Sequence, residues 1–254
     1  MSFTKLVKNR LPAPLWQRGS ALREHYLGTI TGCQTQERIV ALTFDDGPMP
    51  ESTPHILDML ELYDVKATLF LLGQNVADHP QIARAIVKRG HAIGNHTFNH
   101  PRLADLNPVQ VARELRRCQR TIEDAVGTSP ALMRPPYGAR SPGTALTARM
   151  MGHTIVHWSV SGDDWLGDPA TLVAERVLAK VTPGSIVLLH DGWTPTPERR
   201  RGLSQADTAA QSDRTATIAA LPIIIKNLQQ DGYRFVTVPD MLQTAQARKK
   251  LWFA

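Results

Sequence analysis

Short apolar runs that alternate with amphipathic stretches most restrict the fold available to this chain after residue 38. Apolar runs of this length predict strands, and the stretches between them have the periodicity of helices. Strands that alternate with helices indicate a parallel sheet with helices outside it. The expected strands are residues 39–44, 67–72, 91–95, 131–134, 153–158, 185–190 and 233–238.

Helix-end signals support this alternation. Ser, Thr and Asp are typical residues before a first helical turn, Pro is typical within that turn, and Gly is typical after a last turn. We expect the polar residues to cap the helices that they precede. Ser52, Thr53 and Pro54 precede a helix over 55–63, Pro80 and Gly90 bound a second helix, and Asp168 and Pro169 open a third over 170–180.

Seven strand units within about 200 residues favour a closed, slightly short (β/α) barrel. An open doubly wound sheet is the alternative, but no G-x-G-x-x-G motif follows the first strand. We therefore predict an α/β fold in a single domain over residues 38–245. Residues 1–37 lack strand alternation and contain scattered Lys, Arg and Pro, so we expect a short N-terminal extension there.

The composition is that of a globular protein with a basic surface. The 254 residues carry a formal net charge of +6. A basic surface can favour nucleic acid, anionic lipid or anionic glycan, although a solvated surface without a special partner is the favoured interpretation. We expect no nucleic-acid partner and no obligate protein partner. Cys33 and Cys118 have no metal-type spacing, and we interpret them as thiols, with a disulfide as the alternative.

Targeting signals also bear on the expected location. No apolar run approaches the roughly 20 residues that span a bilayer, and the first residues lack the apolar segment of a secretory signal. We therefore expect a cytoplasmic protein. Residues 6–18 and 247–254 both mix basic residues with Trp, so peripheral contact with an anionic membrane is a further hypothesis.

Two adjacent carboxylates, Asp45 and Asp46, end the first expected strand and are followed by Gly47 and Pro48. Neighbouring side chains in a strand point to opposite faces, so a turn at this point is needed to bring both carboxylates to one site. The carboxyl end of a barrel strand is where barrel enzymes have their active sites. Two like charges there require a metal or an Arg to offset them. The alternative is a capping or Asx-turn role.

His96 and His100 follow the strand over 91–95 and are separated by three residues. We expect this spacing to place both imidazoles on one face of a helical turn, an arrangement common in zinc sites. With one Asp they would form a three-ligand site that leaves a position for water. His91 begins the same strand, so we place it at the opposite rim as a structural residue.

Other strand ends bring polar groups to the same rim. Arg134 ends the fourth strand in "MRPPYG", and His190 and Asp191 end the sixth in "SIVLLHD". The loop "WSVSGDDW" adds Asp163 and Asp164. Five strand ends that each supply ionisable side chains indicate one site rather than unrelated structural residues.

The segments "TFDDGP", "HTFNH", "RPPYG", "DDW" and "LLHD" resemble, in order, the five motifs of the polysaccharide deacetylases. This family is the NodB-homology domain of carbohydrate esterase family 4, and the resemblance covers about residues 38–240. It implies a distorted (β/α)7 barrel. It also implies metal-dependent removal of N-acetyl groups, or in some members O-acetyl groups, from sugars such as chitin oligomers, peptidoglycan and xylan.

The resemblance implies roles for ten residues. Ser161 stands where many relatives have an Asp, which leaves open whether Asp163 or Asp164 pairs with the catalytic His, although adjacency to Trp165 favours Asp164. The implied metal ligands are Asp46, His96 and His100, which would hold Zn²⁺ or another divalent metal such as Co²⁺. Asp45 would be the general base, held by Arg134, and His190 would be the general acid, paired with Asp164. The backbone N–H of Tyr137 would bind the oxyanion, and Trp165 and Leu188 would line the acetyl pocket.

The chain looks most like the chitooligosaccharide deacetylases, which share a long loop after "LLHDG". We therefore predict removal of acetate from oligosaccharides that contain N-acetylglucosamine. Trp193 in this loop could stack on a sugar ring or simply pack, and the run Arg199, Arg200 and Arg201 could meet anionic groups or solvent. The alternatives are a peptidoglycan or lipid-linked glycan precursor as substrate, or a non-catalytic glycan-binding relative.

Overall fold

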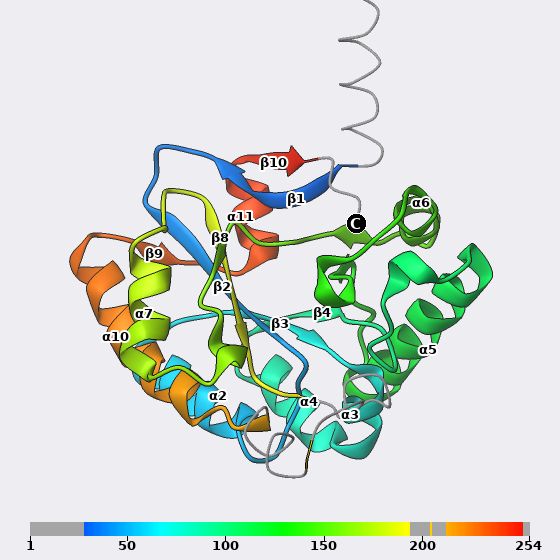
Figure 1. The fold of residues 1–254 in the computed structure, drawn as a ribbon, viewed down its shortest axis with the longest axis horizontal. Helices are drawn as coiled ribbons and strands as arrows, with labels where there is room; N and C mark the ends of the chain where they lie inside the picture. The colour runs from blue at the N-terminus through cyan, green and yellow to red at the C-terminus, as the bar shows by residue number, and fades with distance from the viewer. Residues whose placement is uncertain (1–27, 194–203, 205–211, 251–254) are drawn as a thin grey trace, which may run out of the picture.

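The computed structural model describes residues 28–193, 204 and 212–250, and it confirms the α/β fold with a curled, largely parallel sheet surrounded by helices (Figure 1). Every strand expected from the sequence is present, but most are shorter than expected, and those expected over 131–134, 153–158 and 233–238 have only two residues each. These strands are β2 (Ile39–Asp45), β3 (Thr68–Leu71), β4 (Ala92–Asn95), β5 (Leu132–Met133), β6 (Thr154–Ile155), β8 (Ser185–His190) and β9 (Arg234–Phe235).

The sheet is built around β2, which pairs in parallel with β8 on one side and β3 on the other. From β3 the sheet continues in parallel through β4 and β5 to β6. The carboxyl ends of these strands therefore meet at one rim. Two further short pairings complete this region, since β7 (Val160–Ser161) pairs with β8 and β9 pairs with β2.

One strand lies within the segment that we expected to be an extension without strands, and this expectation is wrong for the described residues. β1 (Thr29–Gln34) pairs with β8 and with β10 (Gln246–Lys250), and Ile30 forms a parallel bridge to Val156 beside β6. β1 thus fills the space between β6 and β8 and closes the barrel. Residues 1–27 of the expected extension lie outside the described part.

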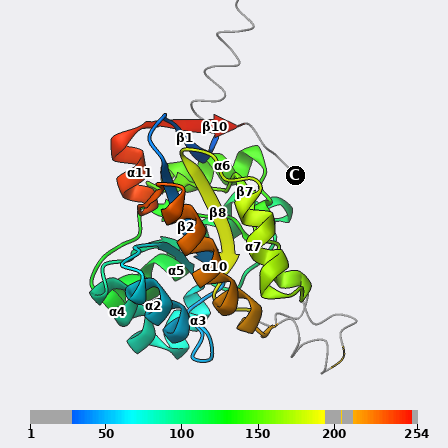
Figure 2. The ribbon, with the colours of Figure 1, turned by 90° about the vertical axis from the view of Figure 1, so that its left-hand side faces the viewer.

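Helices cover the outside of the sheet, and α11 closes the end opposite the rim (Figures 1 and 2). The described helices are α2 (Thr53–Leu62), α3 (Gly73–Asp78), α4 (Pro80–Lys88), α5 (Pro108–Val126), α6 (Pro142–Met150), α7 (Ala170–Leu178), α10 (Thr215–Gln230) and α11 (Val238–Thr244).

The expected helix starts are confirmed, but the expected caps are not. α4 begins at Pro80 and α7 begins just after Pro169, yet no side-chain cap is made at either start. At α2 the hydroxyl groups of Ser52 and Thr53 instead donate hydrogen bonds to Asp191, which follows β8. The polar residues before α2 therefore tie the helix to a neighbouring strand end.

Alternation along β2 separates two apolar clusters. Val40, Leu42 and Phe44 pack against the outer helices, while Ile39 and Ala41 pack inside the barrel. Residues at odd positions of β2 therefore face the barrel interior, which directs the side chain of Asp45 inward at the rim.

The two thiols are free, and both are buried, so the disulfide alternative is excluded. Within the described ranges, 28–193, 204 and 212–250, we find no helix with the length and apolar character needed to cross a bilayer. Most of the two basic, Trp-containing chain ends lies outside those ranges, and membrane contact stays a prediction.

Candidate active site

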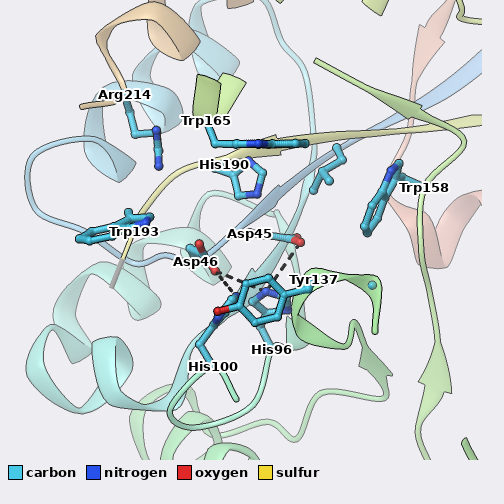
Figure 3. Close-up of a pocket in the computed structure, with 12 residues that line it drawn as sticks. Asp45, Asp46, His96, His100, Tyr137, Trp158, Trp165, His190, Trp193 and Arg214 are labelled. Carbon is cyan, nitrogen blue, oxygen red and sulfur yellow. Dashed lines mark ion pairs between the residues drawn. The ribbon is translucent and has the colours of Figure 1, made fainter. Parts of the chain in front are cut away.

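A cavity of about 600 Å³ opens at the carboxyl ends of the strands (Figure 3). Its lining combines carboxylates, imidazoles and aromatic rings from distant parts of the chain. The lining residues are Asp45, Asp46, His96, His100, Tyr137, Gly138, Trp158, Trp165, Leu188, His190, Trp193 and Arg214.

The adjacent carboxylates do reach one site, and the backbone of Asp46 explains how. Asp45 is the last residue of β2 and faces inward, in register with His190 of β8. Asp46 has a φ of 76°, in the left-handed region, so strand alternation ends there. Its carboxylate therefore also turns into the cavity instead of pointing to the outer helices. Both carboxylates are buried.

The two imidazoles lie together as expected, but the expected helical turn is wrong. Residues 96–100 form a loop in which Thr97 and His100 have φ values of 71° and 61°. The side chain of Asn95 accepts a hydrogen bond from the Thr97 N–H, and the Thr97 hydroxyl accepts one from the His100 N–H. This tight loop, not a helix face, brings the ring of His100 to 5.1 Å from that of His96.

Asp46, His96 and His100 form a cluster that fits a divalent metal. One ligand atom from each lies within 4.8 Å of the others. The Nδ1 atom of His96 lies 2.7 Å from the Arg134 carbonyl oxygen, which can only accept, so Nδ1 holds the proton and Nε2 keeps a lone pair. That Nε2 lies 3.4 Å from Asp46 Oδ1, and the His100 Nε2 lies 3.1 Å from the same oxygen. A carboxylate and two imidazoles are typical zinc ligands.

Arg134 holds Asp45 in place from behind the cavity. Its side chain is fully buried, and Nη1 donates to Asp45 Oδ1 at 2.7 Å and to the Thr43 hydroxyl at 2.8 Å. Nη2 and Nε donate to the carbonyl oxygens of His157 and Val156. The fixed geometry of the guanidinium thus fixes one oxygen of Asp45, while Asp45 Oδ2 lies 3.8 Å from His96 Nε2.

The partner of His190 is Asp164, which resolves the choice between two adjacent carboxylates. Asp164 is buried, with Oδ1 2.7 Å from His190 Nδ1 and Oδ2 accepting the backbone N–H of His190 at 2.8 Å. Asp163 instead accepts a hydrogen bond from the Ser161 hydroxyl at 2.7 Å. Ser161 and Asp163 therefore shape the loop, and Asp164 forms the dyad.

The dyad is electrostatically coupled. Burial by itself would lower the pKa of His190, but the Asp164 carboxylate, with smaller contributions from Asp46 and Asp45, outweighs it and the pKa of His190 is raised. Burial likewise acts to raise the pKa of Asp164, but the neighbouring His190 and Arg214 cations and the Thr217 hydroxyl hold that pKa below its ordinary value. Both shifts favour a charged imidazolium–carboxylate pair.

Aromatic and apolar side chains form the walls. Trp165 is 41% exposed and meets His190 edge to face, and the half-exposed Tyr137 ring meets His100 in the same way. Leu188 and Trp193 also line the cavity, although both are buried and Trp193 is only 6% exposed. The structure therefore brings these four predicted residues to the site. The run from Arg199 to Arg201 lies outside the described residues.

Three residues of the site carry no role in the sequence interpretation. Trp158 and Arg214 line the cavity, and Trp158 begins the quoted segment "WSVSGDDW". Asp191 lies fully buried beneath it and accepts hydrogen bonds from the Gly47 N–H and the Thr53 hydroxyl. The one sequence signal that placed Asp191 near the site was its position directly after the strand that ends in "LLH". His91 lies at the other end of β4, where its Nδ1 accepts the Ala67 N–H.

The sequence and the fold are both similar to those of known proteins. The family model described as polysaccharide deacetylase matches residues 32–156. A peptidoglycan-N-acetylglucosamine deacetylase of Bacillus cereus is 39% identical over 210 residues, which are 83% of this chain and 70% of that protein. A chitooligosaccharide deacetylase of a Bradyrhizobium species is 39% identical over 222 residues, which are 87% of this chain and 96% of that protein. This chain belongs to the polysaccharide deacetylase family.

A solved structure of the family agrees with the fold. A peptidoglycan N-acetylglucosamine deacetylase, crystallised with 4-naphthalen-1-yl-N-oxidanyl-benzamide, superimposes with a TM-score of 0.77 at 35% identity. The match covers 90% of this chain and 99% of that one. The distorted barrel expected from the motifs is therefore confirmed. The segments "TFDDGP", "HTFNH" and "RPPYG" all lie within the residues that the polysaccharide deacetylase model matches.

Proposed function

We propose that this chain is a metal-dependent deacetylase that hydrolyses the N-acetyl groups of oligosaccharides containing N-acetylglucosamine and releases acetate. One observation carries the proposal. A single cavity contains a carboxylate held by an Arg, an imidazole held by a carboxylate, and a three-ligand cluster. These are the parts that amide hydrolysis needs: a base, an acid and a site for an electrophilic cation.

Asp46, His96 and His100 would hold the metal, for which we propose Zn²⁺ or another divalent ion such as Co²⁺. When bound, such an ion supplies Lewis-acid polarisation of the acetyl carbonyl and activation of water. Asp45 lies beside this cluster with its second oxygen directed toward His96. Asp45 is therefore placed to accept the proton of the attacking water.

His190 is placed to supply the other proton. Its Nδ1 is engaged by Asp164, so Nε2–H is the proton that it can donate into the cavity. The C–N bond of the acetamide breaks as the sugar nitrogen takes this proton, because an amine does not leave as an anion. Trp165 and Leu188 would enclose the acetyl methyl group, and the Tyr137 N–H would stabilise the tetrahedral oxyanion.

Chitooligosaccharides are the substrate class that we favour, because the chain spans 96% of a relative named as a chitooligosaccharide deacetylase. Peptidoglycan is the second candidate, since a solved relative named for that substrate is matched over 99% of its chain. A non-catalytic role is disfavoured, because the side chains that we propose as base, acid and metal ligands all line the same cavity.

The test is acetate release by metal-stripped protein, with and without added Zn²⁺ or Co²⁺, from chitooligosaccharides of two to six sugars and from peptidoglycan fragments. We expect metal-dependent release that Asp45→Asn loses although it still binds the metal. Release from peptidoglycan fragments alone would favour the second candidate. Metal binding at one ion per chain without release from either substrate would contradict the proposed reaction, and failure to bind metal would contradict the ligand assignment.

A further inference from the structure

The first turn of α10 reaches the back of the Asp164–His190 dyad. In Figures 1 and 2, α10 runs beside α7 along the outside of β8, the strand that ends in His190. Thr217 lies in this first turn and is fully buried. Its hydroxyl donates a hydrogen bond to Asp164 Oδ2 at 2.7 Å.

The geometry at Asp164 shows what this contact can do. Oδ2 accepts two hydrogen bonds, from the Thr217 hydroxyl and from the His190 backbone N–H, while Oδ1 faces His190 Nδ1 at 2.7 Å. Two donors on one oxygen fix the rotation of the carboxylate about its last bond. That rotation decides whether Oδ1 lies in the plane of the imidazole. The Thr217 hydroxyl therefore sets the alignment of the dyad without lining the cavity.

The same helix start also holds the chain that leaves β8. Arg214, directly before α10, donates from Nε to the carbonyl oxygen of Gly192 at 3.1 Å. Gly192 in turn packs on the backbone of Asp46, where an added Cβ would lie 2.5 Å from the carbonyl oxygen. Apolar side chains of α10, among them Leu221 and Ile224, are buried in the main core, so the helix is a rigid support.

We propose that Thr217 is a positioning residue that orients Asp164 so that His190 can act as the proton donor. The proposal rests on the proposed deacetylase function for the role of His190. Loss of the hydroxyl leaves the dyad in place but with one donor fewer on Asp164. The defect should then appear only in steps that need a proton from His190.

Three variants test this. Thr217→Val keeps the shape of the side chain without its hydroxyl, Thr217→Ser keeps the hydroxyl, and Thr215→Val is the matched control. Thr215 is exposed in the same turn, and its hydroxyl bonds Asp213 rather than the dyad. Each variant is assayed with a chitooligosaccharide, whose amine must be protonated to leave, and with 4-nitrophenyl acetate, whose phenolate leaves unprotonated.

We expect Thr217→Val to lower kcat for the chitooligosaccharide by about 10- to 100-fold with little change in KM, since a hydrogen bond to a charged group is lost. Hydrolysis of 4-nitrophenyl acetate should change by less than about threefold. Thr217→Ser and Thr215→Val should keep both activities. An equal loss on both substrates, or no loss on either, would overturn the proposal.

A second readout needs no substrate. The proton shared by His190 Nδ1 and Asp164 should give a low-field proton NMR signal in the wild-type protein, and Thr217→Val should shift or broaden this signal while Thr217→Ser retains it. If the wild-type protein releases acetate from no glycan, the proposed function fails and this signal alone decides the positioning role. An unchanged signal in Thr217→Val would then refute it.

Discussion

The backbone of Gly47 lies directly against the carboxylate of Asp191. The Gly47 N–H donates a hydrogen bond to Asp191 Oδ1 at 3.0 Å. A Cβ added to Gly47 would lie 2.0 Å from Oδ2 of the same carboxylate, which is closer than any side chain tolerates. A glycine is therefore required directly after the adjacent carboxylates Asp45 and Asp46, because only a residue without a Cβ allows this close approach. Because Asp191 is also held by Thr53 at the start of α2, it fixes the turn that directs Asp46 into the cavity.

Gly47→Ala should displace this turn. We expect the free energy of unfolding to fall by roughly 1–3 kcal/mol, as for overpacking in other proteins, and the affinity for Zn²⁺ to fall with it. Chemical denaturation and isothermal titration with Zn²⁺ are the measurements. Gly143→Ala is the matched control, since its Cβ would meet no atom closer than 3.6 Å and the residue lies in the first turn of α6. Normal metal affinity in Gly47→Ala would contradict this account.

Asp191 should make the metal-free protein less stable as pH rises. Burial raises its pKa to about 7, from a model-compound value of 3.8, with a further contribution from Asp46 and Asp45. The folded state then holds one proton more than the unfolded state between about pH 4 and pH 7, so the free energy of unfolding falls with pH over that window.

Asp191→Asn should remove this decline, because the amide oxygen still accepts the Gly47 N–H and carries no charge. Urea denaturation of both proteins with a chelator present, at half-unit pH steps, gives the two curves. The variant should gain stability relative to the wild type as pH rises through the window. Parallel curves would show that Asp191 does not titrate there.

Replacing Arg134 by Lys keeps the positive charge but should still lower kcat strongly. The guanidinium reaches four partners at once, among them Asp45, while an ammonium on a flexible chain cannot hold that set. We expect kcat to fall at least about 100-fold, with metal binding retained, since Asp45 is then free to rotate. Acetate release and metal content would be measured together. Wild-type kcat in Arg134→Lys would exclude the positioning of Asp45 by the guanidinium.

The ionisation of Asp164 and His190 should limit both activity and stability to a defined pH range. Since the pKa of His190 is raised, its stabilising effect is complete below its unfolded value of 6.5 and is lost as pH rises through the folded value. Since the pKa of Asp164 is lowered, its effect is present above 3.8 and is lost as pH falls through the folded value. The pair is therefore most stabilising between the two unfolded values, 3.8 and 6.5, and its effect declines on either side of them.

Asp164→Asn removes the carboxylate that raises the pKa of His190. We expect the alkaline limb of the kcat profile for chitooligosaccharide deacetylation to move to lower pH, and the stability difference from the wild type to be largest near pH 6. Asp163→Asn is the matched control, because Asp163 bonds Ser161 and not His190. A shift of equal size in Asp163→Asn would show that loss of a nearby negative charge, and not loss of the contact with His190, causes the effect.

Removing one imidazole should remove the metal. His96→Gln is expected to weaken Zn²⁺ binding by more than about 100-fold and to abolish acetate release. His91→Gln is the control, because His91 is equally buried at the opposite end of β4. Titration with Zn²⁺ should give one site per chain in the control and no comparable site in His96→Gln. An unchanged Zn²⁺ affinity in His96→Gln would show that His96 is not a metal ligand.

Local patterns predicted the strands and the residues at their ends, because strand alternation and helix-end signals depend on neighbours in the chain. The inward direction of Asp45 could not be predicted in this way, because every residue of β2 is buried and only the packing of the two clusters shows which face is inside. The loop that joins His96 and His100 was predicted wrongly as a helical turn, since left-handed backbone at Thr97 and His100 leaves no periodic signal.

Contacts between distant segments could not be predicted in the same way. Thr217 reaches Asp164 across 53 positions, and Thr53 reaches Asp191 across 138. Neither threonine differs in type or immediate context from a capping or exposed residue. β1 was missed for a related reason, because its six residues include Gly32 and show no clear alternation, and pairing with β8 and β10 gives it strand structure.

The position of β1 has a consequence for how this chain is made. β1 pairs with Ser185 of β8 and with Val156 beside β6, so both of these neighbours lie far from it in the sequence. The parallel units from β2 to β6 can associate as each one emerges, whereas the wall of the barrel between β6 and β8 needs β1 to form these distant contacts. Contacts of such high sequence separation slow folding. We expect a variant in which β1 cannot pair with β8 to keep the parallel strands from β2 to β6, and the candidate site residues at their ends, on an incompletely closed sheet.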